Sequence, residues 1–259
     1  MTDKMLGAVE GGIGWLTINN PERHNAVSLE MAARGTELIA ELSADKTVRV
    51  IVIRAAGEKA WMSGADIGDF NPKADGSAAP RRPDGLAFYD AVYNCAKPVI
   101  AAIKGYCMGG GVALACACDL RICATDSIIA IPAGKLGISY PANFVRWLQD
   151  TIGMPNTKEM LFTGRRYTAD EALRIGLANR LVAPDALASA AQEYAQSIAE
   201  NAPLSVLANK EIIGVTSKDP SGWDQARLRT LSETTRNSAD FAEGRKAFAE
   251  KRKPVFRGE

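Results

Sequence analysis

A glycine-rich turn that runs into a short apolar stretch is the part of this sequence best suited to chemistry. The segment reads CMGGGVALACACDL over residues 107–120 and has no charged or hydroxyl side chain before Asp119. Consecutive glycines let a backbone come close to a ligand, and a helix that begins there points N–H groups at that ligand. The segment therefore predicts ligand binding by the backbone, with no side chain in the first turn that could move a proton.

The same glycines also fit a tight turn before a packed helix, which would carry no chemistry. A phosphate-binding P-loop is disfavoured, because no Gly-Lys-Ser or Gly-Lys-Thr follows them. The turn alone leaves the binding and structural interpretations open.

Strand-like and helix-like patterns alternate in the first half of the chain, and helices dominate the second half. Strands are expected at 14–19, 48–57 and 97–105, with two strands or one bent strand at 120–131. Helices are expected at 28–45 after a capping serine, 86–96, 143–151, 155–162, 168–176, 184–200, 203–214 and 221–251. This order predicts an α/β fold whose helical tail packs on a neighbour. Residues 68–85, poor in apolar side chains, predict either a mobile loop over the site or a surface insertion.

The composition is that of an ordinary globular protein. The 259 residues are 47% hydrophobic and 24% charged with a formal net charge of +1, which disfavours a general nucleic-acid or membrane-surface binder. Five cysteines in apolar stretches indicate reduced thiols, and Cys116 and Cys118 lack the further ligands of a metal site. Neither a signal peptide nor a membrane span is recognisable, so a cytoplasmic protein without metal, nucleic-acid or membrane partners is expected.

Five segments together resemble the enoyl-CoA hydratase/isomerase superfamily, also called the crotonase family. They are NPERHNAVSLEM, WMSGADIGDF, KPVIAAIKGYCMGGGVALACACDLRICATDS, LFTGRRYTADEALRIGLANRLV and EGRKAFAEKRKPVF, in order between about residues 13 and 256. The resemblance implies a crotonase-like spiral of ββα units over residues 1–200 and a helical C-terminal trimerisation region over 201–259. It also implies homotrimers or dimers of trimers, with an acyl-CoA thioester as substrate and no separate cofactor.

The resemblance further implies an oxyanion hole made by the backbone N–H groups of Ala65 and Gly110, which are the predicted catalytic groups together with Tyr140. Most reactions of this superfamily pass through a thioester enolate, whose charge lies on oxygen. Fixed backbone dipoles stabilise that charge, and losing one such donor costs about 3 kcal/mol in comparable sites. The helix that starts near Gly111 adds its partial positive charge.

Further residues are expected, by the same resemblance, to bind the substrate. Arg23 and the backbone of 62–67 would meet the nucleotide and pantetheine, and Phe248 and Lys251 match positions that reach a neighbouring subunit's CoA. The basic helix end KRK, which includes Lys251, could equally be solvated surface. Asp66 could instead cap the backbone that follows it. The expected substrate-binding residues are Arg23, Ala26, Ser63, Asp66, Ile67, Gly109, Ala113, Ala133, Phe248 and Lys251.

Two acidic residues of the family's hydratases are missing. Those hydratases carry two glutamates that position and activate water, whereas Ala113 and Ala133 stand at these places. Asp119 lies almost two helical turns beyond Ala113 and cannot replace the first glutamate. General acid–base catalysis contributes about 10²–10⁴-fold, so the sequence argues against efficient hydration of an enoyl-CoA.

The segment IPAGKLGISYPANFVRWL (131–148) resembles the matching part of methylmalonyl-CoA decarboxylase, a superfamily member that also lacks both glutamates. There a tyrosine at the place of Tyr140 lies near the substrate carboxylate, so Tyr140 would orient that group by a hydrogen bond. Simple packing of the ring is the alternative. Decarboxylation needs no protein base, because the leaving CO₂ supplies the electron pair. The decarboxylase has histidine at the place of Ala65, whereas the only histidine here, His24, is expected in a loop.

Three classes of function remain open. The first is an enolate-forming acyl-CoA enzyme, most concretely a carboxyacyl-CoA decarboxylase. The second is an isomerase or other lyase in which another polar residue, such as Tyr140 or Asp69, moves the proton. The third is a non-catalytic acyl-CoA-binding protein. Among other pocket candidates, Arg146 would suit a substrate carboxylate if it faces inward. Two enolate donors would add little to a pure binding protein, which favours an enzyme.

Overall fold

The body of the protein contains two β-sheets. The structure is a computed structural model that describes residues 2–66, 83–217 and 219–259. One sheet has the order β1 (Met5–Glu10), β2 (Ile13–Ile18), β3 (Val50–Ala55), β5 (Val99–Ile103), β7 (Leu120–Ala124), β10 (Arg180–Val182). The other has the order β4 (Ala60–Met62), β6 (Tyr106–Met108), β8 (Ile128–Ala130), β9 (Tyr167–Thr168). All neighbouring strands are parallel except the pairs β1–β2 and β8–β9.

Successive strand pairs, each followed by a helix, generate the two sheets. The pairs β3–β4, β5–β6 and β7–β8 each give their first strand to the larger sheet and their second strand to the smaller one. They are followed by α2 (Pro83–Tyr93), α3 (Gly110–Ala117) and α4 (Ala142–Thr163), respectively. This repeat is the predicted spiral of ββα units, and the α/β fold class is confirmed.

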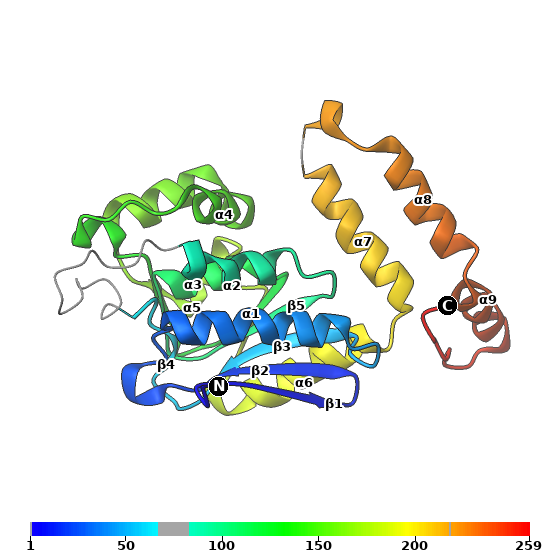
Figure 1. The fold of residues 1–259 in the computed structure, drawn as a ribbon, viewed down its shortest axis with the longest axis horizontal. Coiled ribbons are helices and arrows are strands. Elements are labelled where there is room, and N and C mark those ends of the chain that lie inside the picture. The colour runs from blue at the N-terminus through cyan, green and yellow to red at the C-terminus, as the bar shows by residue number, and fades with distance from the viewer. Residues whose placement is uncertain (1, 67–82, 218) are drawn as a thin grey trace.

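The central strands β2, β3, β5 and β7 of the larger sheet are mostly buried on both faces, as expected for parallel strands covered by helices. In β3, Ile51 and Ile53 face the core that α1 (Leu29–Ala44) shares with α2 to α4, whereas Val50 and Val52 face α6 (Leu187–Ala199). Figure 1 shows α1 and α6 on opposite faces of this sheet. All five cysteines are buried and unpaired in this body.

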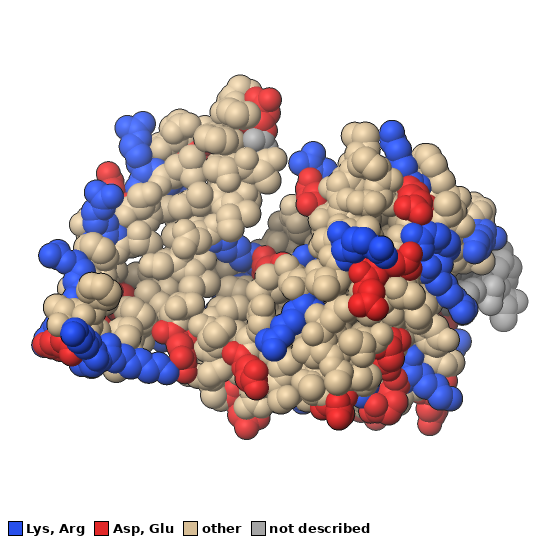
Figure 2. Space-filling view, turned by 180° about the vertical axis from the view of Figure 1, so that it is seen from behind, with Lys and Arg blue, Asp and Glu red and all other residues tan. Residues whose placement is uncertain are grey.

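The C-terminal helices project away from the body (Figure 1). They are α7 (Pro203–Thr216), α8 (Gln225–Arg236) and α9 (Ala239–Glu250), and they are called the arm below. Figure 2 shows open space between the arm and the body. The arm exposes apolar side chains, including Ile213 and Phe248. Its predicted association with a second copy stays a prediction. No helix in the described part of the chain is both long and apolar enough to cross a membrane.

Several elements differ from the sequence-based expectation. The helix expected at 221–251 is two helices, because Ser238 caps α9 by accepting a hydrogen bond from the Phe241 N–H. The helices expected at 143–151 and 155–162 form α4, which is broken at Gly153, where φ is 73°. The strand β1 and the short strands β4, β6, β9 and β10 were not expected. The loop expected at 68–85 lies mostly outside the described residues.

The remaining short elements connect these layers. They are η1 (Pro21–Arg23), η3 (Ala133–Leu136), α5 (Ala169–Arg174), η4 (Pro184–Ala186) and η5 (Pro220–Gly222). Ser28 caps α1 by accepting a hydrogen bond from the Met31 N–H, as the sequence predicts.

Candidate active site

Two glycine-containing turns meet at the N-terminus of α3. A methyl group built on Gly110 would lie 3.4 Å from the Ala65 nitrogen, and one built on Gly64 would lie 3.5 Å from the Gly110 nitrogen. Both turns use backbone conformations that favour glycine, with φ of 112° at Gly64 and 50° at Gly109. The structure thus brings the two predicted donors, Ala65 and Gly110, together. Their catalytic role stays a prediction.

The Gly110 N–H is held by hydrogen bonds on the other side of its peptide group. The Gly109 carbonyl oxygen accepts hydrogen bonds from the Val112 N–H at 3.0 Å, the Ala113 N–H at 3.3 Å and the Tyr140 hydroxyl at 2.9 Å. A trans peptide directs its C=O and N–H in opposite directions. Fixing this carbonyl therefore fixes the direction of the Gly110 N–H, and hydrogen bonds to the carbonyl polarise the donor further.

The Ala65 N–H is held in the same way. The Gly64 carbonyl oxygen accepts a hydrogen bond from the Val27 N–H at 2.9 Å, and the Asp66 N–H donates to the Val27 carbonyl at 2.9 Å. The Ser63 N–H donates to the His24 carbonyl at 3.1 Å. The segment that carries Ala65 is therefore positioned by the chain around residues 24–27.

A buried asparagine, which the sequence interpretation did not single out, organises that segment. The Asn25 side-chain amide donates to the carbonyls of Ala56 at 2.9 Å and Ala60 at 2.6 Å, and its oxygen accepts from the Asn20 N–H at 2.8 Å. Asn25 has a φ of 56°, which asparagine tolerates better than most residues. The preceding His24 is exposed in this loop, as expected. Asn25 ends the turn-forming stretch NPERHN, and an asparagine in such a turn was the signal that could have revealed this role.

Arg23 and Asp66 form an ion pair at the edge of the site. The Arg23 guanidinium lies 3.0 Å from the Asp66 carboxylate, whose side chain is 9% exposed, whereas that of Arg23 is 59% exposed. The Ser63 hydroxyl donates a hydrogen bond to the Arg23 carbonyl at 3.4 Å, and Ala26 is half-buried. The expected contacts of these residues with CoA stay predictions. Ile67 and Asp69 lie outside the described residues.

Aromatic side chains line the same turn from α2 and α4. A methyl group on Gly110 would lie 2.6 Å from the hydroxyl oxygen of Tyr89, a residue that is 5% exposed. The Phe144 ring lies between the two phenols, with centroids 4.7 Å from Tyr89 and 5.5 Å from Tyr140. Burial raises the pKa of Tyr140 well above the usual value for a phenol. Tyr140 therefore keeps its proton over the working range of an enzyme.

The two alanines lie where the sequence comparison with hydratases places glutamates. Ala113 is buried in α3 and its N–H faces the Tyr140 hydroxyl, and Ala133 is half-buried at the start of η3. Asp119 lies beyond the far end of α3, where its carboxylate accepts hydrogen bonds from the Val99 N–H and the Lys210 ammonium. Asp119 thus does not replace a missing glutamate, as predicted.

Three of the residues considered from the sequence lie away from the glycine turns. Arg146 is exposed and pairs at 2.8 Å with Asp150 on the surface of α4, so its position does not suit a buried substrate carboxylate. Phe248, which is 88% exposed, and Lys251 lie at α9, far from α3 in the same chain (Figure 1). Their contact with a neighbouring subunit's CoA stays a prediction.

A buried arginine supports the opposite end of α3. The Arg121 guanidinium donates to the carbonyls of Ala115 at 3.2 Å, Cys118 at 2.8 Å and Leu177 at 2.6 Å. A cation at a helix C-terminus satisfies its last carbonyls and matches the helix dipole. The sequence interpretation did not predict this role, since an arginine inside a strand gives no local signal of it.

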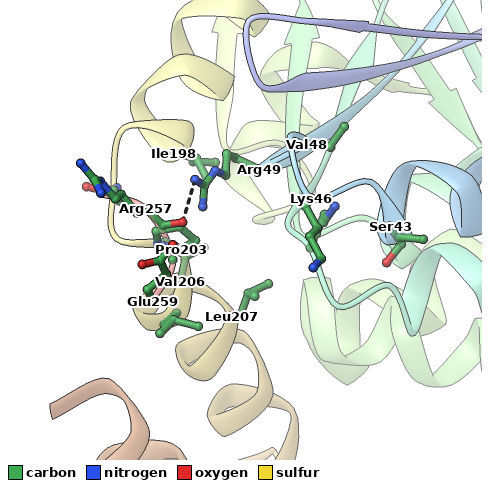
Figure 3. A pocket seen from close by; sticks show the side chains of 15 residues that line it. Ser43, Lys46, Val48, Arg49, Ile198, Pro203, Val206, Leu207, Arg257 and Glu259 are labelled. Atoms are coloured by element: carbon green, nitrogen blue, oxygen red, sulfur yellow. Dashed lines mark hydrogen bonds between the residues drawn. The ribbon is translucent and has the colours of Figure 1, made fainter. Parts of the chain in front are cut away.

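A separate cavity of about 440 Å³ lies where the arm leaves the body (Figure 3). Arg49 on its wall donates a hydrogen bond to the Arg257 carbonyl, as the dashed line shows. Arg49 and Lys97 precede β3 and β5, whereas the turns at Gly64 and Gly109 follow β4 and β6. The cavity is therefore distinct from the candidate site.

Comparison with known proteins supports the fold and the resemblance found in the sequence. A family model described as enoyl-CoA hydratase/isomerase matches residues 8–259. The chain is 37% identical over 250 residues to (E)-benzylidenesuccinyl-CoA hydratase of Thauera aromatica, covering 96% of this chain and 97% of the relative. It is also 37% identical to carnitinyl-CoA dehydratase of Citrobacter koseri, over the full length of both.

Solved structures show the same similarity. An enoyl-CoA hydratase/carnithine racemase from Magnetospirillum magneticum superposes with a TM-score of 0.92 at 34% identity, covering 100% of this chain and 97% of that one. An enoyl-CoA hydratase from Bacillus anthracis superposes with a TM-score of 0.90 at 29% identity, covering 99% and 100%.

Proposed function

The chain belongs to the enoyl-CoA hydratase/isomerase family of acyl-CoA-processing enzymes, and we propose that it forms a thioester enolate without help from a protein carboxylate. Its most concrete reaction is the decarboxylation of a 2-carboxyacyl-CoA. The observation that carries this proposal is the combination of two braced donors, at Ala65 and Gly110, with alanine at both glutamate positions.

Decarboxylation requires little more than these donors. The bond between C2 and the carboxylate carbon breaks, and its electron pair forms the enolate while CO₂ leaves. The thioester oxygen takes the negative charge and accepts hydrogen bonds from Ala65 and Gly110, an interaction that grows as the charge develops. C2 then takes up one proton. The products are CO₂ and the shortened acyl-CoA.

The lining of the site supports a small acyl group that becomes apolar once its carboxylate has left as CO₂. The Ala113 methyl is buried, Ala133 is half-buried, and the Phe144 ring closes the wall between the two phenols. These described side chains leave space for carbon, and none of them is a carboxylate that could activate water. Malonyl-CoA and methylmalonyl-CoA are the substrates that fit this description best.

A second candidate is hydration of an enoyl-CoA or the reverse dehydration. The names of the two curated relatives, a hydratase and a dehydratase at 37% identity, favour it. In this chain the proton transfers would fall to residues other than Ala113 and Ala133. The two reactions demand different substrates and leave different mass changes, so one assay separates them.

The test is mass spectrometry of purified protein incubated in parallel with malonyl-CoA, methylmalonyl-CoA and crotonyl-CoA. We expect loss of CO₂ from a carboxyacyl-CoA while crotonyl-CoA stays unchanged. Addition of water to crotonyl-CoA at an ordinary enzymatic rate contradicts the proposal and supports hydration. A shifted double bond in a wider acyl-CoA panel would indicate an isomerase, and binding without turnover a non-catalytic acyl-CoA-binding protein.

The variant Gly110→Ala tests the oxyanion hole itself. Its methyl group would enter the space next to the Tyr89 hydroxyl and the Ala65 nitrogen. We expect turnover to fall at least about 100-fold with unchanged far-UV circular dichroism. The matched control is Gly214→Ala on α7, where an added methyl meets no atom within 4 Å. Wild-type activity in folded Gly110→Ala would refute the assignment.

A further inference from the structure

Two phenols reach the glycine turn, and each meets a different residue of it. The Tyr140 hydroxyl donates to the Gly109 carbonyl, on the side away from the Gly110 N–H. The Tyr89 hydroxyl lies near the Gly110 Cα, 2.6 Å from the position of a methyl group built on that atom. The two hydroxyls therefore have different surroundings and different uses.

The Tyr89 hydroxyl lies close to both predicted oxyanion donors. The Ala65 nitrogen and the Tyr89 hydroxyl oxygen both lie within 3.4 Å of the same point above Gly110. In a bound thioester, the carbonyl oxygen would accept hydrogen bonds from Ala65 and Gly110. The carbonyl carbon is one bond from that thioester oxygen, and C2 is two bonds from it. The phenol therefore lies beside the predicted oxyanion hole, where it could reach C2 of a bound acyl group.

Packing fixes this phenol from both sides. Its ring contacts Phe144 of α4 with an interplanar angle of 47° and Phe88 of α2 at a centroid distance of 6.0 Å. Phe88 in turn sits over Gly35 of α1, where a methyl group would lie 2.7 Å from the ring. The Asn143 amide donates to the Asp90 carboxylate at 3.1 Å and ties α2 to α4. A side chain held in this way suits a reaction that depends on geometry.

We propose that the Tyr89 hydroxyl is the acid that delivers the proton to C2 of the enolate, an inference that rests on the proposed enolate chemistry. The phenol O–H bond breaks, a C2–H bond forms with the electron pair of the enolate, and the phenolate regains a proton from solvent. A phenol ordinarily keeps its proton up to about pH 10 and is a far stronger acid than the C–H bond it forms. Tyr140 takes no part in this step, because its proton is directed at the Gly109 carbonyl.

The step is reversible in principle, and this gives a test that does not depend on CO₂ release. Propionyl-CoA is incubated in D₂O with wild type, Tyr89→Phe and the matched control Tyr93→Phe, and deuterium at C2 is measured by mass spectrometry. Tyr93 lies one turn along α2, is 43% exposed and stacks on Trp147 at 4.7 Å, away from the glycine turn. We expect exchange in the wild type and in Tyr93→Phe, and an exchange rate at least about 100-fold lower in Tyr89→Phe.

Deuteration of the product from methylmalonyl-CoA provides a second readout. The wild type should place deuterium at C2 in a single configuration, whereas Tyr89→Phe should give a mixture because water then supplies the deuteron from either face. Equal exchange in wild type and Tyr89→Phe, or no exchange in the wild type, overturns the role of Tyr89. Exchange that depends on Tyr89 without CO₂ release from any carboxyacyl-CoA upholds that role and overturns decarboxylation instead.

Discussion

Removing the Tyr140 hydroxyl distinguishes a residue that positions the oxyanion hole from one that transfers a proton. Tyr140→Phe deletes one of three hydrogen bonds to the Gly109 carbonyl and leaves those from the Val112 and Ala113 N–H groups. A neutral hydrogen bond of this kind contributes about 0.5–1.5 kcal/mol, whereas loss of a whole oxyanion donor costs about 3 kcal/mol. Because the Gly110 N–H remains, we expect kcat/KM to fall about tenfold, equivalent to about 1.4 kcal/mol.

The pH dependence sharpens this prediction. Burial raises the pKa of Tyr140 well above its ordinary value of 10.0, so the folded protein favours the neutral phenol. An unfolded tyrosine ionises near pH 10. Below that pH Tyr140 is neutral in both the folded and the unfolded chain, so it adds no pH dependence to the stability. Above that pH only the unfolded chain ionises, so the stability of the folded protein falls. We expect the activity profile of Tyr140→Phe to keep the wild-type shape below pH 10. Its stability should fall less steeply than that of the wild type above pH 10.

The carbonyl stretch of bound [1-¹³C]propionyl-CoA provides the direct assay, because polarisation by the oxyanion hole lowers its frequency. Infrared difference spectra should show a smaller shift in Tyr140→Phe than in the wild type, and Tyr93→Phe should match the wild type. The positioning role would be refuted if Tyr140→Phe lost activity about 10³-fold or more while its carbonyl shift stayed that of the wild type. The pH profile of its activity would then also lack an ionisation that the wild type shows. That result would make Tyr140 the proton-transfer group.

Three further predictions concern the framework around the site. Asn25→Ala should lower the free energy of unfolding by about 3 kcal/mol, because buried backbone groups lose their partners; a change below about 1 kcal/mol in a urea titration would contradict this. Gly111→Ala should fail to fold, since its methyl would overlap a backbone carbonyl oxygen; a native circular dichroism spectrum would show otherwise. Hydrogen bonds from Arg252 and the Val255 N–H lower the pKa of Glu243 to about 2. The ionised Glu243 therefore adds stability above pH 4.5, and this stability is lost as the pH falls toward 2. The protection of the Val255 amide against hydrogen exchange should fall over the same pH range; constant protection would contradict this.

The elements with long periodic patterns were predictable from the sequence. The run VRVIVIRAAG gave the buried strand β3, because alternate β-branched side chains fill the cores on both of its faces. The strands β4 and β6 have three residues each, too few for any period to be recognised. Their pairing comes from tertiary structure, and those strands carry the turns of the candidate site.

The candidate site was predictable in its donors but not in its supports. The positions of Ala65 and Gly110 followed from the family resemblance, since backbone N–H groups leave no trace in residue type. The roles of Asn25 and Arg121 depend on carbonyl groups that are distant in the sequence or at a helix end. Such partners are defined only once the chain has folded.

The construction of the predicted oxyanion hole explains how the chain can retain these two donors while both glutamates are absent. Each donor peptide is fixed through its carbonyl, Gly64 by the Val27 N–H and Gly109 by α3 and Tyr140. The far end of α3 is held by the buried Arg121. None of these supports involves a side chain at 113 or 133, so changing those two residues alters the available proton transfers without moving the donors. The predicted donors and the acid–base groups are therefore physically separable, and the proton chemistry of this chain can depend on the Tyr89 phenol, which enters from α2.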